Sequence, residues 1–127
     1  MEKSLHKKII VTTLGTGTPI LNPKRASQSI LVEAAGHRLL FDTGRNIATR
    51  LVQAKVKPSS VKQVFFTHFH SDHTVGFADF WLSSWIPAGG ARTSPLNVSG
   101  PSGTLNLIEG HRIAFSDDIK IRAKVQG

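Results

Sequence analysis

The sequence has 127 residues, of which 39% are hydrophobic, and this is enough for one domain with a buried core. It contains no cysteine, so disulfides and thiolate metal sites are excluded, and any metal ligand must be nitrogen or oxygen. The start, Met1 to Leu5, lacks a long apolar segment, so we expect no signal peptide and no membrane span. A cytoplasmic location is the default expectation.

The chain is strongly basic, with a net charge of +8 and a pI near 10.5. Most of the cations lie in the first half, among them Lys7, Lys8, Lys24, Arg25, Arg38, Arg45, Arg50, Lys55, Lys57 and Lys62. A basic surface attracts polyanions such as RNA and speeds encounters with them. An ordinary solvated surface fits equally well, because the charges are spread out instead of forming a run.

The first predicted strand covers residues 8–14, which are β-branched and apolar. It ends in a turn that contains Gly15, Thr16 and Gly17, where glycine allows close approach of the backbone. Backbone N–H groups of such a turn can bind a phosphate or a developing oxyanion. A plain connection between two strands is an equally good interpretation.

Residues 29–33 and 37–41 form two further strands, and residues 34–36 form a hairpin turn between them. Residues 45–56 have apolar positions at helical spacing, and Pro58 ends this predicted helix. Asp42 follows the second strand of the hairpin. It can cap the helix, or it can orient a metal-bound histidine from behind, and the two roles are compatible.

Further along, aromatic side chains recur at three and four residues over 77–85, which predicts an amphipathic helix. We favour core packing for these aromatic residues over a platform for stacking bases. Residues 96–98 form a short strand, and a helical stretch then runs towards His111. Residues 119–125 alternate apolar and basic, which predicts a half-exposed strand.

The stretch from Thr67 to His73 is the most informative, because it holds three histidines and an aspartate directly after an apolar run. Imidazole is the commonest protein ligand of zinc-like metals, and carboxylate is a frequent companion. If residues 64–66 form a buried strand, the loop that follows can direct His68 and His70 to one metal. Asp72 and His73 are then available for a second. Two metals about 3.5–4 Å apart can share a bridging hydroxide. A loop of solvated histidines is the alternative, and it explains four ligand-type residues in six positions poorly.

This motif resembles the histidine-x-histidine-x-aspartate-histidine signature of the metallo-β-lactamase superfamily. The turn at residues 14–19, the segment 40–44 and the motif follow in the order of that superfamily. The segment Gly100 to Thr104 resembles a Gly-Pro turn of its ribonuclease Z branch, which is similar to proteins described as arylsulfatases or cyclic phosphodiesterases. The resemblance runs over essentially the whole chain.

The resemblance implies an α/β fold, the αββα sandwich in which the metals sit at one edge of two packed sheets. It implies that His68 and His70 bind the first metal, and Asp72 and His73 the second. Asp72 would also orient or deprotonate the attacking water, and Asp42 would support the ligands. Two divalent ions are implied, zinc first, with manganese or iron as alternatives.

Complete members supply three more ligands from later in the chain, and His111 is the only histidine after the motif. It precedes the last predicted strand, where the family has no ligand, so we assign it no metal. Residues 1–127 therefore correspond to the N-terminal part of a single domain, roughly the first half of the fold. Half a sandwich leaves one sheet face uncovered and gives each metal two protein ligands where catalytic zinc has three.

The expected function of the parent protein is metal-dependent hydrolysis of phosphoesters, namely RNA 3′-end processing by a metal-bridging hydroxide. The anionic substrate would be RNA, and no membrane is involved. An arylsulfatase or a cyclic phosphodiesterase of the same fold is an alternative. A non-catalytic fragment that binds RNA or a partner is another, and a homodimer is one way to complete the site. The chain alone is expected to be weakly active or inactive.

Overall fold

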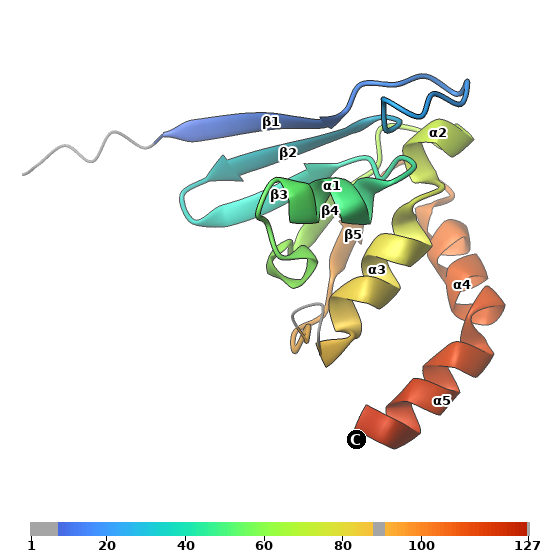
Figure 1. Ribbon diagram of the computed structural model, residues 1–127. Coiled ribbons are helices and arrows are strands. Elements are labelled where there is room, and N and C mark those ends of the chain that lie inside the picture. Colours follow the sequence, from blue (N-terminus) through green and yellow to red (C-terminus); the bar gives the residue numbers. More distant parts are fainter. Residues whose placement is uncertain (1–7, 88–90, 127) are drawn as a thin grey trace, which may run out of the picture.

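A computed structural model describes residues 8–87 and 91–126 and contains one five-stranded sheet in the order β1-β2-β3-β4-β5. The strands are β1 (Ile9–Gly15), β2 (Ser29–Ala34), β3 (His37–Phe41), β4 (Gln63–Phe65) and β5 (Asn97–Ser99). The helices are α1 (Ile47–Gln53), α2 (Ser71–Thr74), α3 (Phe77–Trp85), α4 (Thr104–Ala114) and α5 (Ser116–Gln126), with a 3₁₀ turn at Pro58–Ser60. Figure 1 shows α1 and α3 together in front of the sheet.

The first three strands are antiparallel, and β3, β4 and β5 are parallel. The predicted hairpin is confirmed, because Ala35 and Gly36 both have positive φ and form a two-residue turn between β2 and β3. α2 and this hairpin turn lie at opposite ends of the sheet (Figure 1). The parallel strands β3 and β4 both run towards the α2 end, and this brings the segments that follow them together.

The core lies between the sheet and the helices α1 and α3. Leu31, Leu40 and Val64 are fully buried and share one row across β2, β3 and β4. Phe77 and Phe80 of α3 are also buried. This confirms that the aromatic helix packs into the core, with Trp81 partly buried against the same cluster.

The helix predicted over residues 45–56 is present but shorter, and Asn46 is its N-cap. Asp42 is therefore not the helix cap: it lies four residues earlier, and its carboxylate is directed to the loop after β4. Among the described residues, no helix has the length and apolar character needed to cross a membrane.

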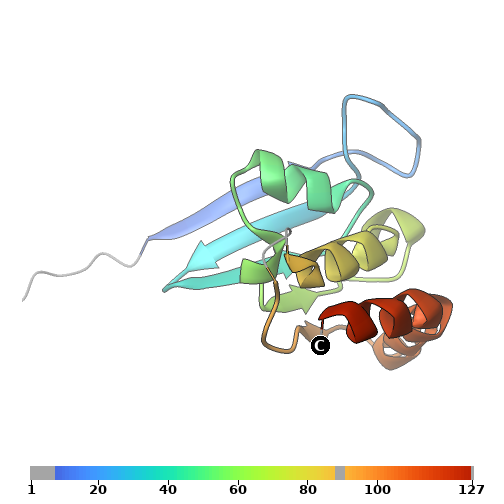
Figure 2. The ribbon, with the colours of Figure 1, turned by 60° about the horizontal axis from the view of Figure 1, so that its bottom comes forward.

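The strand predicted over residues 119–125 is wrong, because these residues lie in α5. Alternation of apolar and basic residues favours a strand only where one face is buried. Here Ile121 is 65% exposed and Val125 is 82% exposed. Asp118 and Arg122 form an ion pair of 3.0 Å at the i,i+4 spacing of a helix. Two aspartates in the first turn also suit the helix dipole. Figures 1 and 2 show α4 and α5, one after the other along the chain, at one side of the sheet.

Candidate metal centre

The candidate metal centre forms where the chain leaves β3 and β4. The N–H of Asp42 donates to Phe65 O at 2.8 Å, and the N–H of Thr43 donates to His73 O at 2.8 Å. These bonds fasten the segment after β3 to the segment after β4. Gly44 has no room for a side chain, since a Cβ there would lie 2.7 Å from the carbonyl oxygen of Asp72. The sequence Asp42-Thr43-Gly44 thus holds the histidine motif at the end of the sheet.

The Asp42 carboxylate is 5% exposed as a residue and accepts three hydrogen bonds. The N–H of Thr67 donates to Oδ1 at 2.8 Å, and the hydroxyl of Thr67 donates to Oδ2 at 2.6 Å. His73 Nδ1 donates to Oδ2 at 2.7 Å. A carboxylate can only accept, so this contact places the ring proton of His73 on Nδ1 and leaves the lone pair on Nε2.

The same reasoning assigns the tautomer of His68. The Thr67 hydroxyl has one proton, which it gives to Asp42, so it accepts from His68 Nδ1 at 3.0 Å. The lone pair of His68 is therefore on Nε2, which lies 3.0 Å from His70 Nδ1. Asp42 thus orients two histidines, one directly and one through Thr67. Sequence reasoning gave Thr67 no role; the available signal is a hydroxyl residue directly before the first histidine of the motif.

The four predicted ligand residues lie together. The ring centroids of His68 and His70 are 4.7 Å apart, and those of His68 and His73 are 4.1 Å apart. His73 Nε2 lies 3.5 Å from Asp72 Oδ2. Asp72 is buried, whereas His68 and His70 are exposed. The cluster is therefore open to solvent on the side of the two histidines and anchored in the protein on the side of the aspartates.

The donor atoms fit metal ions as two pairs. Two nitrogens bound to one tetrahedral zinc at about 2.0–2.1 Å lie roughly 3.3 Å from each other, close to the 3.0 Å between His68 Nε2 and His70 Nδ1. Asp72 Oδ2 and His73 Nε2 form the second pair. Within the part of the chain that the structure describes, no three or more His, Asp or Glu side chains are arranged to hold one metal ion. The four candidate ligand residues therefore lie as two pairs, and their assignment to two ions stays a prediction.

His111 lies in α4, as the helical prediction for this segment required. Its Nδ1 contacts the carbonyl of Leu107 at 2.7 Å, and its ring packs edge-on against Phe77 at 5.2 Å. This is a packing role within the helical layer.

The glycine turn lies against the loop after it. The N–H of Gly17 donates to Ala26 O at 2.7 Å, so this group is already used within the protein. A Cβ on Gly17 would lie 2.7 Å from the same oxygen, and a Cβ on Gly15 would lie even closer to the carbonyl oxygen of Ser27. Close backbone approach therefore explains both glycines. Of the three residues, Thr16 is exposed.

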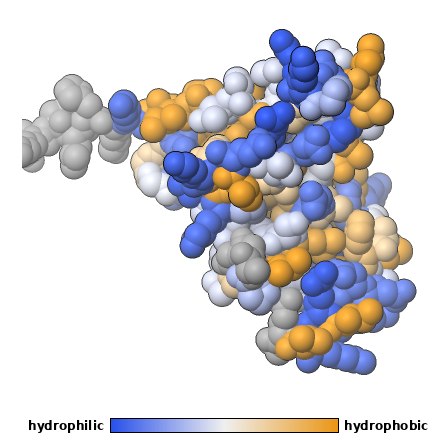
Figure 3. All heavy atoms as spheres, viewed as in Figure 1, coloured by the Kyte–Doolittle hydropathy of each residue, from blue (hydrophilic) through white to orange (hydrophobic). Residues whose placement is uncertain are grey.

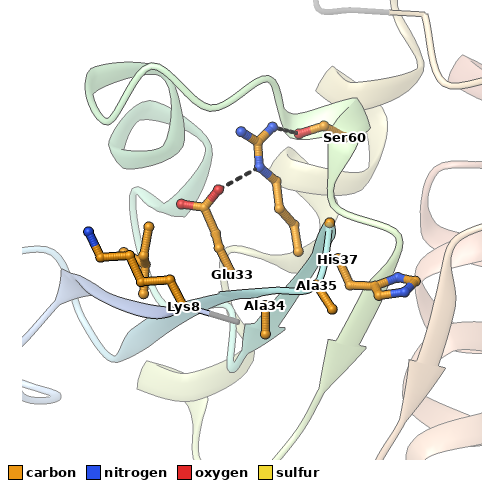
Figure 4. Close-up of a pocket in the computed structure, with 9 residues that line it drawn as sticks. Lys8, Glu33, Ala34, Ala35, His37 and Ser60 are labelled. Atoms are coloured by element: carbon orange, nitrogen blue, oxygen red, sulfur yellow. Dashed lines mark hydrogen bonds and ion pairs between the residues drawn. The ribbon is translucent and has the colours of Figure 1, made fainter. Parts of the chain in front are cut away.

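A pocket of about 370 Å³ lies at the other end of the sheet, beside the hairpin turn (Figure 4). Its polar groups satisfy each other: Arg38 Nε donates to Glu33 at 3.0 Å, and Arg38 Nη1 donates to Ser60 at 2.7 Å. These contacts join β2 and β3 to the 3₁₀ turn. These contacts give Glu33, Arg38 and Ser60 a structural role. The histidine motif therefore remains the candidate functional site.

Comparison with solved structures defines the class of protein. The short form of human tRNase Z matches with a TM-score of 0.72 and 27% identity, over 82% of this chain and 39% of that one. The metallo-β-lactamase fold protein YhfI from Bacillus subtilis matches with a TM-score of 0.69 and 18% identity, over 80% of this chain and 42% of that one. The chain is an α/β protein of the metallo-β-lactamase fold, in its ribonuclease Z-like branch, and covers the first part of that fold.

The chain belongs to the family described as "Anti-Pycsar protein Apyc1", whose model matches residues 9–94. Ribonuclease Z from Mycobacterium marinum is 40% identical over 114 residues, which are 90% of this chain and 41% of that protein. Ribonuclease Z from Mycobacterium bovis is 38% identical over 112 residues, 88% of this chain and 40% of that protein. The chain therefore spans about two fifths of the length of these relatives.

Proposed function

We propose that the protein containing this chain is a metal-dependent phosphoester hydrolase that processes RNA 3′ ends. The observation that carries the proposal is the clustering of His68, His70, Asp72 and His73 at the end of the sheet, with the lone pairs of His68 and His73 on Nε2. Its relatives named ribonuclease Z, at 40% and 38% identity, supply the substrate class. A cytoplasmic location belongs to the same proposal.

In this proposal, His68 and His70 hold one divalent ion, and Asp72 and His73 hold the other. Two such ions, zinc first, would activate water at neutral pH and neutralise charge on the phosphoryl group. Asp72 orients the attacking water and accepts its proton. Asp42 and Thr67 keep the imidazole rings of His73 and His68 in the required orientation, which is a positioning role.

Cations near the site support an anionic substrate. Lys24, Arg25 and Arg50 line a polar hollow of about 170 Å³ beside the glycine turn. Arg45 follows the Asp42-Thr43-Gly44 segment directly, and its guanidinium contacts Pro19 O at 3.5 Å. Figure 3 shows hydrophilic residues beside hydrophobic ones in this part of the molecule. Phosphate groups of an RNA chain match this charge.

The test uses the natural protein that contains this chain, with a tRNA precursor that carries a 3′ trailer as substrate. His70→Ala is expected to lower cleavage by at least about 100-fold, because one ion loses a protein ligand. His37→Ala is the matched control, since His37 is exposed and lies at the hairpin end of the sheet. Cleavage by His70→Ala at the rate of the unaltered protein would overturn the proposal.

A second candidate function is a cyclic phosphodiesterase of the same fold. It is kept because the sequence motifs also resemble proteins described as cyclic phosphodiesterases, and the family model that matches residues 9–94 is not described as ribonuclease Z. The two candidates use the same metal ligands and differ in substrate. Cleavage of cyclic nucleotides by the natural protein, with no cleavage of the tRNA precursor, would select the second candidate.

A further inference from the structure

A polar hollow at the end of β1 takes no part in the proposed metal chemistry. It has a volume of about 170 Å³, and Lys24, Arg25 and Arg50 line it together with Gly15 and Thr16. Among the residues that the structure describes, no acidic side chain lines it, and no ion pair neutralises any of its cations. This hollow, called the basic hollow below, therefore presents positive charge without a counter-charge.

Neutral acceptors hold the cations of the basic hollow in place. Arg50 Nη2 donates to Lys24 O at 3.4 Å, and Arg50 Nη1 donates to Gln53 Oε1 at 3.1 Å. The N–H of Lys24 donates to Asn22 Oδ1 at 2.9 Å, which fastens the loop that carries Lys24. Neutral acceptors leave the charge of a guanidinium uncompensated, and a charge-assisted bond to a phosphate oxygen is about twice as strong as a neutral one. Arg50 is therefore oriented for an anion before one binds.

The basic hollow and the histidine motif lie at the same end of the sheet. β1 is antiparallel to β2, and β2 is antiparallel to β3, so β1 runs in the same direction as β3 and β4. The hollow lies at the carboxyl end of β1, and the motif follows the carboxyl end of β4 (Figure 1). β1 and β4 are three places apart in the sheet, so their ends are separated by about 14 Å at the usual spacing of neighbouring strands. One phosphate group cannot contact both sites.

This separation restricts the anion that can use both sites. A cyclic mononucleotide has one phosphate, which cannot contact the metal ligands and the basic hollow together. RNA has one phosphate per nucleotide, so a strand that reaches the metal ligands brings further phosphates within reach of the hollow. None of the described residues that line the hollow is aromatic, so it offers no platform for stacking a base. Its chemistry suits the RNA backbone and is independent of base sequence.

We propose that the basic hollow binds a backbone phosphate of RNA other than the phosphate that is cleaved. Lys24, Arg25 and Arg50 supply the charge, and the exposed Thr16 supplies a hydroxyl donor. The hollow holds the strand in position while the phosphoryl group reacts at the metal ligands. This inference rests on the proposed function and narrows it, because it selects a polynucleotide substrate over a cyclic mononucleotide.

The test measures the affinity of the natural protein for a labelled tRNA by fluorescence anisotropy over a range of salt concentrations. The tRNA has no 3′ trailer, so that binding is followed without cleavage. Arg50→Gln and Lys24→Gln each remove one charge from the basic hollow. Arg112→Gln is the matched control, because it removes the same charge from a side chain on α4 that is 64% exposed. Arg50→Lys keeps the charge but loses the fork of donors.

We expect Arg50→Gln and Lys24→Gln each to weaken tRNA binding about tenfold, because a charge-assisted hydrogen bond to a phosphate is lost. The slope of log affinity against log salt should become shallower by about 0.7–0.9 in both, and should stay unchanged in Arg50→Lys and Arg112→Gln. An equal loss of affinity in Arg112→Gln, or an unchanged slope in both variants of the basic hollow, would overturn the inference. Binding of tRNA that depends on Arg50, without cleavage of a tRNA precursor, would contradict the proposed function and support this inference.

Discussion

Asp42 is the residue on which the candidate site depends. Its φ of 62° is in the left-handed region, which non-glycine residues seldom adopt. Three hydrogen bonds to its carboxylate and one from Ser29 Oγ to its carbonyl, at 2.8 Å, hold it there. Strain of this kind persists where the surrounding structure fixes the residue, and it is common at functional sites.

Asp42→Asn tests this dependence. The variant keeps the size of the side chain but replaces one accepting oxygen by a donor, so either His73 or Thr67 loses its partner. Zinc affinity of the natural protein should fall about 10–100-fold. Competition with a coloured chelator measures it. Asp117→Asn, on the exposed surface of α5, is the control. Equal zinc affinity of Asp42→Asn and the unaltered protein would contradict the orienting role of Asp42.

Two threonines near Asp42 give a matched pair. The Thr43 hydroxyl is buried without a hydrogen-bond partner, whereas the Thr67 hydroxyl bonds to Asp42 at 2.6 Å. Thr43→Val should therefore leave the free energy of unfolding unchanged or raise it. Thr67→Val should lower it by about 1–3 kcal/mol, because a buried carboxylate loses a donor. Urea denaturation of the 127-residue chain measures both. The opposite order of stability would show that the hydrogen bonds of this site are misassigned.

At the level of elements, the periodicity of apolar residues correctly predicted the strands and helices that pack on the core. It gave the wrong element for the C-terminal segment, whose side chains are mostly exposed. The strands β1 to β4 and the helix α3 were predicted because one side of each carries apolar residues that are buried or packed on the core. α5 was predicted as a strand, because its alternation of isoleucine and basic residues has no buried side to decide between periods. Its ion pair at i,i+4 spacing was the signal for a helix.

Glycines in two elements are expected to respond in opposite ways. Gly110 lies within α4 with no atom within 4 Å of an added Cβ, so Gly110→Ala should stabilise the chain by about 0.5–1 kcal/mol. Gly17→Ala should destabilise it by at least about 1 kcal/mol, because the new methyl would collide with the carbonyl of Ala26. Thermal unfolding followed by circular dichroism compares them. A stabilising effect of Gly17→Ala would mean that the turn does not pack against residue 26 as described.

For the whole molecule, the motif and its order with the neighbouring segments were sufficient to predict the fold class, and the comparisons confirm it. The assignment of His68, His70, Asp72 and His73 to metals stays a prediction. The hydrogen bonds that link Asp42 to Thr67 and Thr67 to His68 could not be predicted from the sequence. Asp42 and Thr67 are 25 positions apart, and the register of β3 and β4 brings them together. Nor did it indicate that Gly17 N–H is used by Ala26.

The central claim is that two pairs of side chains in this chain bind divalent ions in the natural protein. The most direct measurement is the zinc content of that protein after dialysis, determined by elemental analysis for the unaltered form, His68→Ala and His37→Ala. The account predicts two zinc ions in the unaltered form and in His37→Ala, and fewer in His68→Ala, because His68 Nε2 lies beside His70 Nδ1 as a ligand pair. An unchanged zinc content in His68→Ala, or no zinc in any form after loading, would contradict it.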